Sequence, residues 1–330
     1  MALVTTFMTT PLLRWICPPE ELAKDQVPLP PVALPAGQVP FTVLMCVSHG
    51  QAGIGMVTLG RALTGVPNEP FQLFALHLER PTGRISAHRR REQEGNGGNA
   101  LAPLLGQAST LGLEVRPLSF VSVEPGLDIC RTAAAKQAQL ILLGLHKPLF
   151  SRTMLGGTVH EVMQEANSDV AVLVDRGLKE VRRVLVPFIG SAHDWAALSL
   201  ARRLLRAVGA ELTVLHVTAP EHGQSEPNAR AAVETLFSGE SAGRVHFKAV
   251  AHGSPEDAAL EEAKQGYDLV VVGVGSEWGL EDSLFGLQRE RLIGDAPTSL
   301  LVIRHPRSER AAERADKPGT APGLPAKDAV

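Results

Sequence analysis

The chain has 330 residues, a hydrophobic content of 44% and a formal net charge of −3, which is enough material for two medium-sized domains with sizeable cores. The near-neutral charge, the lack of a sustained basic block and an aromatic content of only 4% exclude typical nucleic-acid-binding proteins. The three cysteines, Cys17, Cys46 and Cys130, are widely spaced and form no CxxC pair, which is typical of buried thiols in a reducing compartment rather than of a metal site.

The chain begins with an apolar arm, residues 1–17, and a proline-rich linker, residues 18–40. The arm lacks the charged start of a signal peptide, and its thirteen uncharged residues before Arg14 are fewer than the roughly 20 needed to span a bilayer. The arm is either the end of a spanning helix whose earlier part is missing or an apolar segment that packs on the domain or stays unstructured. Seven prolines exclude regular structure from the linker, which is expected to be semi-rigid.

Apolar runs and helix-like segments alternate through the first predicted domain, residues 41–177. The expected strands are residues 41–48, 71–78, 113–121, 139–143 and 170–174, and the expected helices lie near residues 50–63, 100–111, 125–136 and 159–166. Residues 80–99 are rich in Arg, Glu, Gly and Asn and predict an exposed loop.

The same alternation restarts in the second predicted domain, residues 182–305. The expected strands are residues 184–187, 212–217, 245–251, 268–274 and 299–303, with helices at 194–208 and 228–236. A further helix is expected to start at Ser254, with serine as N-cap, Pro255 at the first helical position and acidic residues in the first turn. Residues 306–330 are predicted to be a disordered tail.

The two domains are an internal repeat. Three pairs of segments correspond, namely VLMCVSHG from Val43 with VLVPFIGS from Val184, LILLGLHK from Leu140 with LVVVGVGS from Leu269, and DVAVLVDR from Asp169 with PTSLLVIR from Pro297. The alternation predicts an α/β fold with two Rossmann-like units, each a five-stranded parallel sheet with helices on both faces. Ligands of such sheets bind at the carboxyl ends of the strands where the strand order reverses, which places Ser48 and Gly144 at the expected site.

A glycine-rich loop follows the fourth strand of the first domain, from Gly144 to His160. Lys147 follows the strand, and Gly156, Gly157 and Thr158 open the next helix, so the loop can present backbone N–H groups, a hydroxyl and a cation to a phosphate. The structural alternatives are a surface lysine, a tight turn and a helix cap. His146 and His160 flank the loop and are either groups that titrate there near neutral pH or structural histidines.

The second domain has a weaker version of this site. Its candidate residues are Ser191, Gly273, Gly275 and Gly286. Trp278 and Phe285 can instead fill the pocket and make this domain structural. The sequence contains no GxSxG elbow, Walker lysine motif, HExxH or paired-cysteine zinc site, so no catalytic residue and no metal is predicted.

From Phe41 to His305 these motifs resemble the universal stress protein family, with the domain present twice. In nucleotide-binding members of that family the fourth strand ends in Gly, two residues, Gly, nine residues and Gly-Ser/Thr. Here Lys147 replaces the second glycine of the first copy, and Leu287 replaces the hydroxyl residue of the second. Family members also carry an aspartate near the end of the first strand, where this chain has Ser48 and Ile189. The resemblance implies ATP, AMP or another adenine nucleotide as ligand, and pairing through the fifth strands as a homodimer or an internal pseudo-dimer.

A second resemblance concerns bacterial monovalent cation:proton antiporters, including sodium/hydrogen exchangers. ALVTTFMTTPLL, from Ala2 to Leu13, is similar to the end of their last transmembrane helix, and GLHKPLFSRTMLGGTVHEVM and VAVLVDRG are similar to segments of their cytoplasmic tails. This implies a non-enzymatic regulatory module that is cytoplasmic or lies at the cytoplasmic face of the inner membrane, with an antiporter transmembrane domain as its partner. The alternatives are a stand-alone stress-response protein with slow ATPase activity and a structural dimerisation module.

Overall fold

The structure is a computed structural model that describes residues 39–48, 53–79, 81, 100–145, 157–218, 225–240, 243–274 and 291–306. By its internal contacts the chain divides into Met1–Val39 and Pro40–Val330, and nearly all described residues belong to the second part. The predictions for the apolar arm, for most of the linker, for nearly all of the 80–99 loop and for the C-terminal tail therefore lie outside the described residues. Within those residues, no helix has the length and apolar character needed to cross a membrane.

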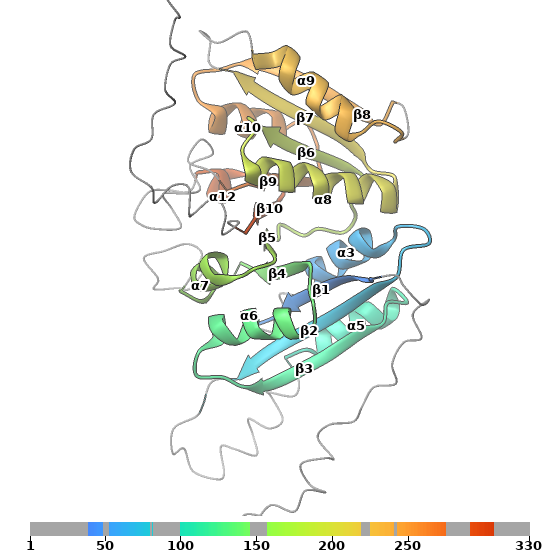
Figure 1. Cartoon of the computed structure of the whole chain (residues 1–330), viewed down its shortest axis with the longest axis vertical. Helices are drawn as coiled ribbons and strands as arrows, with labels where there is room; N and C mark the ends of the chain where they lie inside the picture. Colours follow the sequence, from blue (N-terminus) through green and yellow to red (C-terminus); the bar gives the residue numbers. More distant parts are fainter. Residues whose placement is uncertain are drawn as a thin grey trace, which may run out of the picture. The chain divides into compact units, whose positions relative to one another are not determined.

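The first copy of the repeat, here called repeat 1, alternates strands and helices as predicted (Figure 1). Its elements are β1 (Phe41–Cys46), α3 (Gly53–Thr64), β2 (Phe71–Glu79), α5 (Ala102–Thr110), β3 (Val115–Val121), α6 (Pro125–Ala135), β4 (Leu140–Gly144), α7 (Gly157–Glu165) and β5 (Asp169–Val174).

The second copy, repeat 2, follows the same order after a short connection. Its elements are β6 (Arg183–Phe188), α8 (Ala192–Val208), β7 (Glu211–Thr218), α9 (Ser225–Leu236), β8 (Val245–Ala251), α10 (Pro255–Ala263), β9 (Leu269–Gly273), α12 (Arg291–Asp295) and β10 (Ser299–Arg304). The predicted start of α10 is confirmed, because Ser254 is its N-cap, the Ser254 side chain accepts a hydrogen bond from the Asp257 N–H, and Pro255 follows the cap.

All ten strands form one sheet in the order β3-β2-β1-β4-β5-β10-β9-β6-β7-β8. Strands within each repeat are parallel, so the predicted units of five parallel strands with helical crossovers are confirmed, and the two units form halves of one mixed sheet. In repeat 1 the order reverses between β1 and β4, which pair from Val43↔Leu140 to Cys46↔Leu143. The predicted switch point is therefore present, and the loops after β1 and β4 leave the same edge of the sheet.

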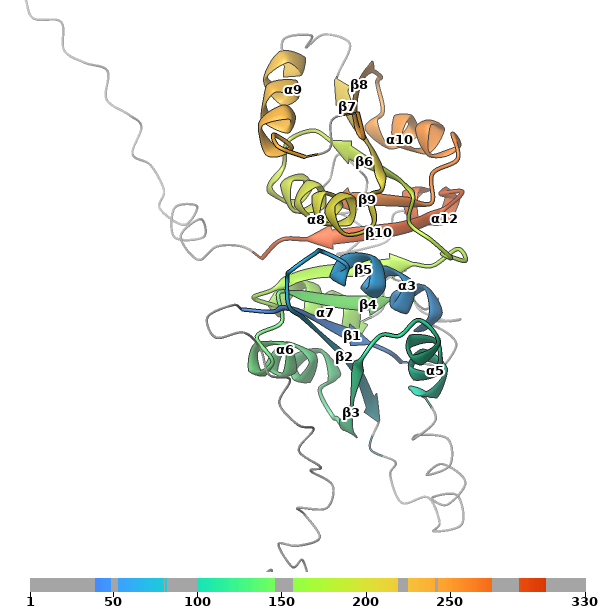
Figure 2. The same ribbon diagram turned by 90° about the vertical axis from the view of Figure 1, so that its right-hand side faces the viewer.

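The two repeats join through their fifth strands. β5 and β10 pair antiparallel over five residue pairs, from Val170↔Arg304 to Val174↔Leu300, and lie side by side at the middle of the sheet (Figure 2). The expected internal pseudo-dimer is thus formed within one chain. Because β5 and β10 each have a second neighbour in their own repeat, neither is left as a free sheet edge.

The hydrophobic core continues across this seam on both faces of the sheet. One cluster packs residues of α3, α5, α8 and α9, such as Leu59 and Leu204, on one face, and the other packs residues of α6, α7, α10 and α12, such as Val162 and Leu292, on the opposite face. Each cluster includes strand residues of both repeats. The two repeats therefore share one core rather than touching as separate domains. Because burial of apolar surface is the main stabilising term in folding, this shared core is expected to hold the repeats together.

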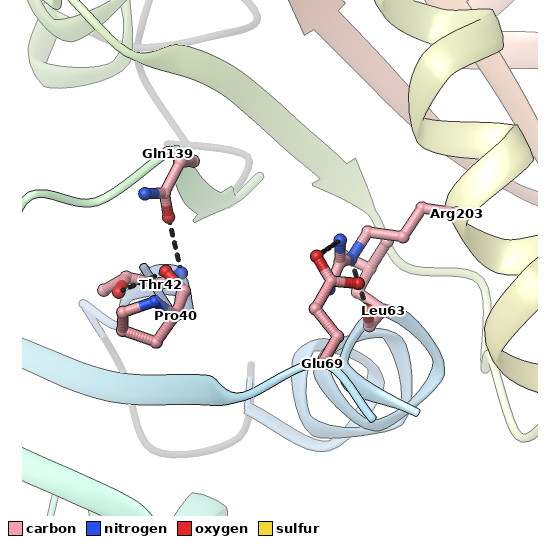
Figure 3. Close-up of polar contacts among 6 residues, drawn as sticks. All are labelled: Pro40, Thr42, Leu63, Glu69, Gln139 and Arg203. Carbon is pink, nitrogen blue, oxygen red and sulfur yellow. Dashed lines mark hydrogen bonds and ion pairs between the residues drawn. The ribbon is translucent and has the colours of Figure 1, made fainter. Parts of the chain in front are cut away.

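Polar side-chain contacts also connect the two repeats. Arg203 of α8 reaches repeat 1, where its Nε donates to the Leu63 carbonyl oxygen at 2.6 Å and its Nη1 lies 3.0 Å from Glu69 Oε1 (Figure 3). Arg176, after β5, donates to two carbonyl oxygens near the C-terminal end of α12, both at 2.9 Å. Arg304, at the corresponding position of repeat 2, donates to two carbonyl oxygens at the C-terminal end of α7, at 2.8 and 3.2 Å. Arg176 and Arg304 therefore cap a helix of the other repeat reciprocally.

Candidate functional site

The predicted site of repeat 1 lies at the carboxyl ends of β1 and β4. Gly144 is the last residue of β4, and Ser48 is an exposed residue two positions after the end of β1. Since Cys46 and Leu143 are register partners, the backbones that lead to Ser48 and Gly144 leave the sheet together. The structure therefore brings these two predicted residues to one edge, at the switch point where ligands of parallel sheets bind.

A buried histidine that the sequence reasoning missed holds the end of β1 in place. His77 of β2 is 8% exposed, and its Nδ1 lies 2.9 Å from the carbonyl oxygen of Val47, the residue before Ser48. A carbonyl oxygen only accepts hydrogen bonds, so Nδ1 carries the proton and donates it. His216 of β7 makes the same contact with Phe188, at 2.9 Å, in repeat 2. The sequence signal for this contact is a histidine between two apolar residues at corresponding positions of β2 and β7, LHL and LHV.

The glycine loop of repeat 1 reaches the described residues at the start of α7. Gly157 and Thr158 are the first two residues of this helix, and Gly157 is exposed. A Cβ at Gly157 would meet no atom within 4 Å, so packing does not require glycine at this position. Glycine here would let a ligand approach the backbone closely. The first backbone N–H groups of a helix have no partner within the helix and can bind an anion, and Thr158 adds a hydroxyl at this end of α7. The predicted contacts at His146, Lys147 and Gly156 lie outside the described residues.

In repeat 2 the predicted residue Ser191 is the N-cap of α8. Its side chain accepts a hydrogen bond from the Asp194 N–H at 3.1 Å, and the two residues form a capping box. Asp194 was missed by the sequence reasoning although the Ser-x-x-Asp spacing signals such a box. It is fully buried, and its Oδ2 accepts hydrogen bonds from the backbone N–H groups of Ile189, Gly190 and Ser191 at 3.0–3.1 Å.

The structure brings Ser191 and Gly273 into one neighbourhood. A Cβ at Gly273, the last residue of β9, would lie 2.5 Å from the carbonyl carbon of His193 and 2.6 Å from the nitrogen of Asp194. The first turn of α8 therefore packs directly on the end of β9, and glycine at 273 is a packing requirement. The remaining predicted residues of this site, Gly275 and Gly286, and the pocket-filling candidates Trp278 and Phe285 lie outside the described residues.

Two cysteine thiols lie within repeat 1, Cys46 at the end of β1 and Cys130 in α6. Desolvation by burial raises the pKa of Cys46 far above its ordinary value, with a smaller contribution from Cys130. Burial, followed by the negative charges of Glu161 and Glu165, raises the pKa of Cys130 to about 11. Both groups therefore stay protonated at neutral pH and are poor nucleophiles and metal ligands. Across the part of the chain that the structure describes, no three His, Cys, Asp or Glu side chains are grouped so that they could hold a metal ion.

A family model supplies the decisive comparison. The model of the universal stress protein family matches this chain twice, over residues 69–174 and 180–304. The chain belongs to the universal stress protein family. The second match spans repeat 2, and the first spans repeat 1 from β2 to β5, so this is a tandem member of the family.

Curated relatives add a link to transporters. The chain is similar to cation/H⁺ antiporters of Arabidopsis thaliana, with 29% identity to antiporter 18 over 67% of this chain and 28% identity to antiporter 17 over 65%. It spans 32% and 31% of the lengths of these two relatives, so only about a third of each is represented. The relationship to antiporters expected from the sequence is therefore found, here in plant proteins.

Solved structures agree on the fold. A universal stress protein of Archaeoglobus fulgidus is 18% identical, with a TM-score of 0.58 over 80% of this chain and 96% of that chain. The cytoplasmic domain of a prokaryotic cation chloride cotransporter is 13% identical, with a TM-score of 0.51 over 81% of this chain and 96% of that chain. These likenesses extend over both repeats and concern the fold alone.

Proposed function

We propose that this chain is a regulatory module that binds an adenine nucleotide at repeat 1 and biases the activity of a cation:proton antiporter. The observation that carries the proposal is the switch point, where the backbones that lead to Ser48 and Gly144 leave one edge of the sheet. Gly157 and Thr158 begin α7, the helix that follows β4 in the chain. This arrangement provides backbone N–H groups and hydroxyls at the place where an open parallel sheet binds phosphate-bearing ligands.

The antiporter part of the proposal is supported by the kinship with cation/H⁺ antiporters. A ligand can bias a transporter only by the difference in its affinity for two conformations, and such coupling is typically worth about 1–3 kcal/mol, or roughly 5–150-fold in an equilibrium. Binding alone is sufficient for this role, so the proposal contains no chemical step. Phosphate release from ATP that is lost in a Thr158→Val variant would instead make the protein an ATPase.

Nucleotide binding is tested by isothermal titration calorimetry of the full chain with ATP, AMP and a cyclic dinucleotide. Saturable binding is expected for the wild type and is expected to be lost in Gly157→Val, whose side chain blocks the N-terminus of α7. Gly294→Val in α12 is the matched control, because a Cβ at Gly294 also meets no atom within 4 Å. Absence of heat at roughly millimolar ligand, or equal binding by Gly157→Val, would contradict the proposal.

Regulation is tested in inverted membrane vesicles that contain a cation:proton antiporter from the same organism. Addition of the chain with ATP is expected to change the rate of cation-driven proton movement, and the Gly157→Val variant is expected to leave it unchanged. A rate that responds equally to both proteins would contradict control by the nucleotide.

A further inference from the structure

The two repeats differ at the first turn of the helix that follows their first strand. In repeat 2 this turn contains Asp194, and the corresponding residue of repeat 1, counted from the matched segments at Val43 and Val184, is Gly53. A Cβ at Gly53 would lie 2.7 Å from the Cβ of Leu104, so repeat 1 has no room there for an aspartate. The difference is therefore built into the packing of each repeat.

Asp194 occupies the place of a bound anion in repeat 2. Three consecutive backbone N–H groups, those of Ile189, Gly190 and Ser191, converge on its Oδ2 at 3.0–3.1 Å. Successive N–H groups that point into one concavity form a typical anion-binding nest. Here the anion is a carboxylate of the chain itself, and it is fully buried. A ligand phosphate or carboxylate would have to displace it and take these three hydrogen bonds from a buried charge, which is costly.

In the described part of repeat 2, backbone of α8 also lies against the end of β9. β6 and β9 pair at only two positions, Val184↔Leu269 and Leu185↔Val270, and the ladder stops before Pro187, which has no N–H to donate. Beyond that point the first turn of α8 packs against Gly273, and a built Cβ at Gly273 would lie 2.8 Å from Asp194 Oδ1. Among the described residues, the first turn of α8 and its aspartate therefore lie directly on the end of β9.

The corresponding helix of repeat 1, α3, contains no acidic residue. A carboxylate does lie against α3, because a Cβ at Gly55 would be 2.2 Å from Asp175 Oδ2. Its Oδ1, however, accepts hydrogen bonds from the backbone N–H groups of Gly177 and Leu178, both at 2.8 Å, in the connection to repeat 2. Asp175 therefore orders the connection between the repeats, whereas Asp194 orders the ligand loop of its own repeat.

From this asymmetry we infer that repeat 2 is permanently liganded by its own Asp194 carboxylate, and that the protein has one exchangeable nucleotide site per chain, in repeat 1. This inference rests on the proposed function for the identity of the ligand, but the internal anion of repeat 2 can be tested without it. Under this inference, repeat 1 exchanges the ligand, and repeat 2 keeps one fixed state and pairs with repeat 1 through β5 and β10.

The internal anion is tested by chemical rescue of Asp194→Gly, which copies the residue of repeat 1. Inorganic phosphate, at an ionic strength matched with sodium chloride, is expected to raise the melting temperature of this variant by about 2–4 °C more than that of the wild type. Asp257→Gly is the matched control, because Asp257 also follows a serine N-cap by three residues but is paired with Arg291 at 2.8 Å. An equal phosphate effect on all three proteins would overturn the inference.

The number of sites is tested by calorimetric titration of ATP, and this arm holds even if Asp194→Gly does not fold. One site per chain is expected for the wild type and for the Gly294→Val control, and none for Gly157→Val. Two sites in the wild type, or one site that survives in Gly157→Val, would overturn the inference. No site in the wild type would reject the proposed nucleotide function, and the phosphate experiment alone would then decide whether Asp194 is an internal anion.

Discussion

Arg203 is the side chain whose removal tests the seam between the repeats most sharply. It belongs to repeat 2, yet all its hydrogen bonds shown in Figure 3 are to repeat 1. Its side chain is 13% exposed, and its guanidinium carbon lies 3.5 Å from the centre of the Phe41 ring. Replacement by alanine therefore removes a charged hydrogen bond, a stacked cation and an ion pair at once.

The magnitude follows from these three contacts. A charge-assisted hydrogen bond to the buried end of α3 is worth about 1.5 kcal/mol, and stacking on Phe41 is worth about 1 kcal/mol. Since the Glu69 side chain is 35% exposed, its ion pair is partly screened and is worth about 0.5 kcal/mol. Arg203→Ala removes all three contacts, so it is expected to lower the free energy of unfolding by about 3 kcal/mol.

Urea unfolding followed by circular dichroism measures this loss. The matched control is Arg202→Ala on the same helix, since Arg202 pairs with Glu240 at 2.8 Å inside repeat 2 and its side chain is 37% exposed. That variant is expected to lose no more than about 1 kcal/mol. If Arg203→Ala lost less than the Arg202 control, Arg203 would not hold the repeats together.

Three further predictions concern the seam, the closed site and the thiols. Arg304→Gln and Arg176→Gln are each expected to lower the free energy of unfolding by about 1–2 kcal/mol. Arg304→Gln should also speed amide exchange in α7, and Arg176→Gln should speed it in α12. Exchange that rises only within the mutated repeat would contradict the reciprocal caps. Gly273→Ala is expected to cost about 3 kcal/mol in thermal unfolding, since its Cβ would overlap backbone atoms, whereas Gly294→Ala, with open space, stays near the wild type; equal losses would refute the close packing of β9 and α8. Because the pKa of Cys130 is raised from 9.0 to about 11, the folded state favours the protonated thiol; its stabilising contribution is complete below pH 9 and is lost as the pH rises towards 11. The alkylation rate of Cys130 should therefore keep rising up to about pH 11, and a rate that levels off near pH 9 would be inconsistent with burial of the thiol.

The fold was predictable because its signals are local. Buried parallel strands such as Leu140–Gly144 are continuous apolar runs, and the helix start at Ser254 follows directly from its capping residues. The alternation of strands and helices then placed Ser48 and Gly144 at one edge, since the carboxyl ends of parallel strands meet there.

The contacts that distinguish the repeats were not predictable in the same way. Arg203 contacts residues more than 130 positions away, and no local pattern identifies such a partner. The capping box at Ser191 and Asp194 was visible as a spacing, but the convergence of three N–H groups on one oxygen depends on the folded loop. The pairing of β5 with β10 came from family resemblance, because apolar strands carry no mark of their neighbour.

Hydrogen–deuterium exchange with and without ATP locates the ligand and tests the account most directly. ATP is expected to slow exchange in peptides that cover the end of β4 and the start of α7, at Gly144 and Gly157–Thr158. Peptides that cover residues 189–194 of repeat 2 should stay unchanged, since the N–H groups of residues 189–191 are already bonded to Asp194 and that of Asp194 to Ser191. Protection at residues 189–194 without protection at the start of α7 would contradict the account.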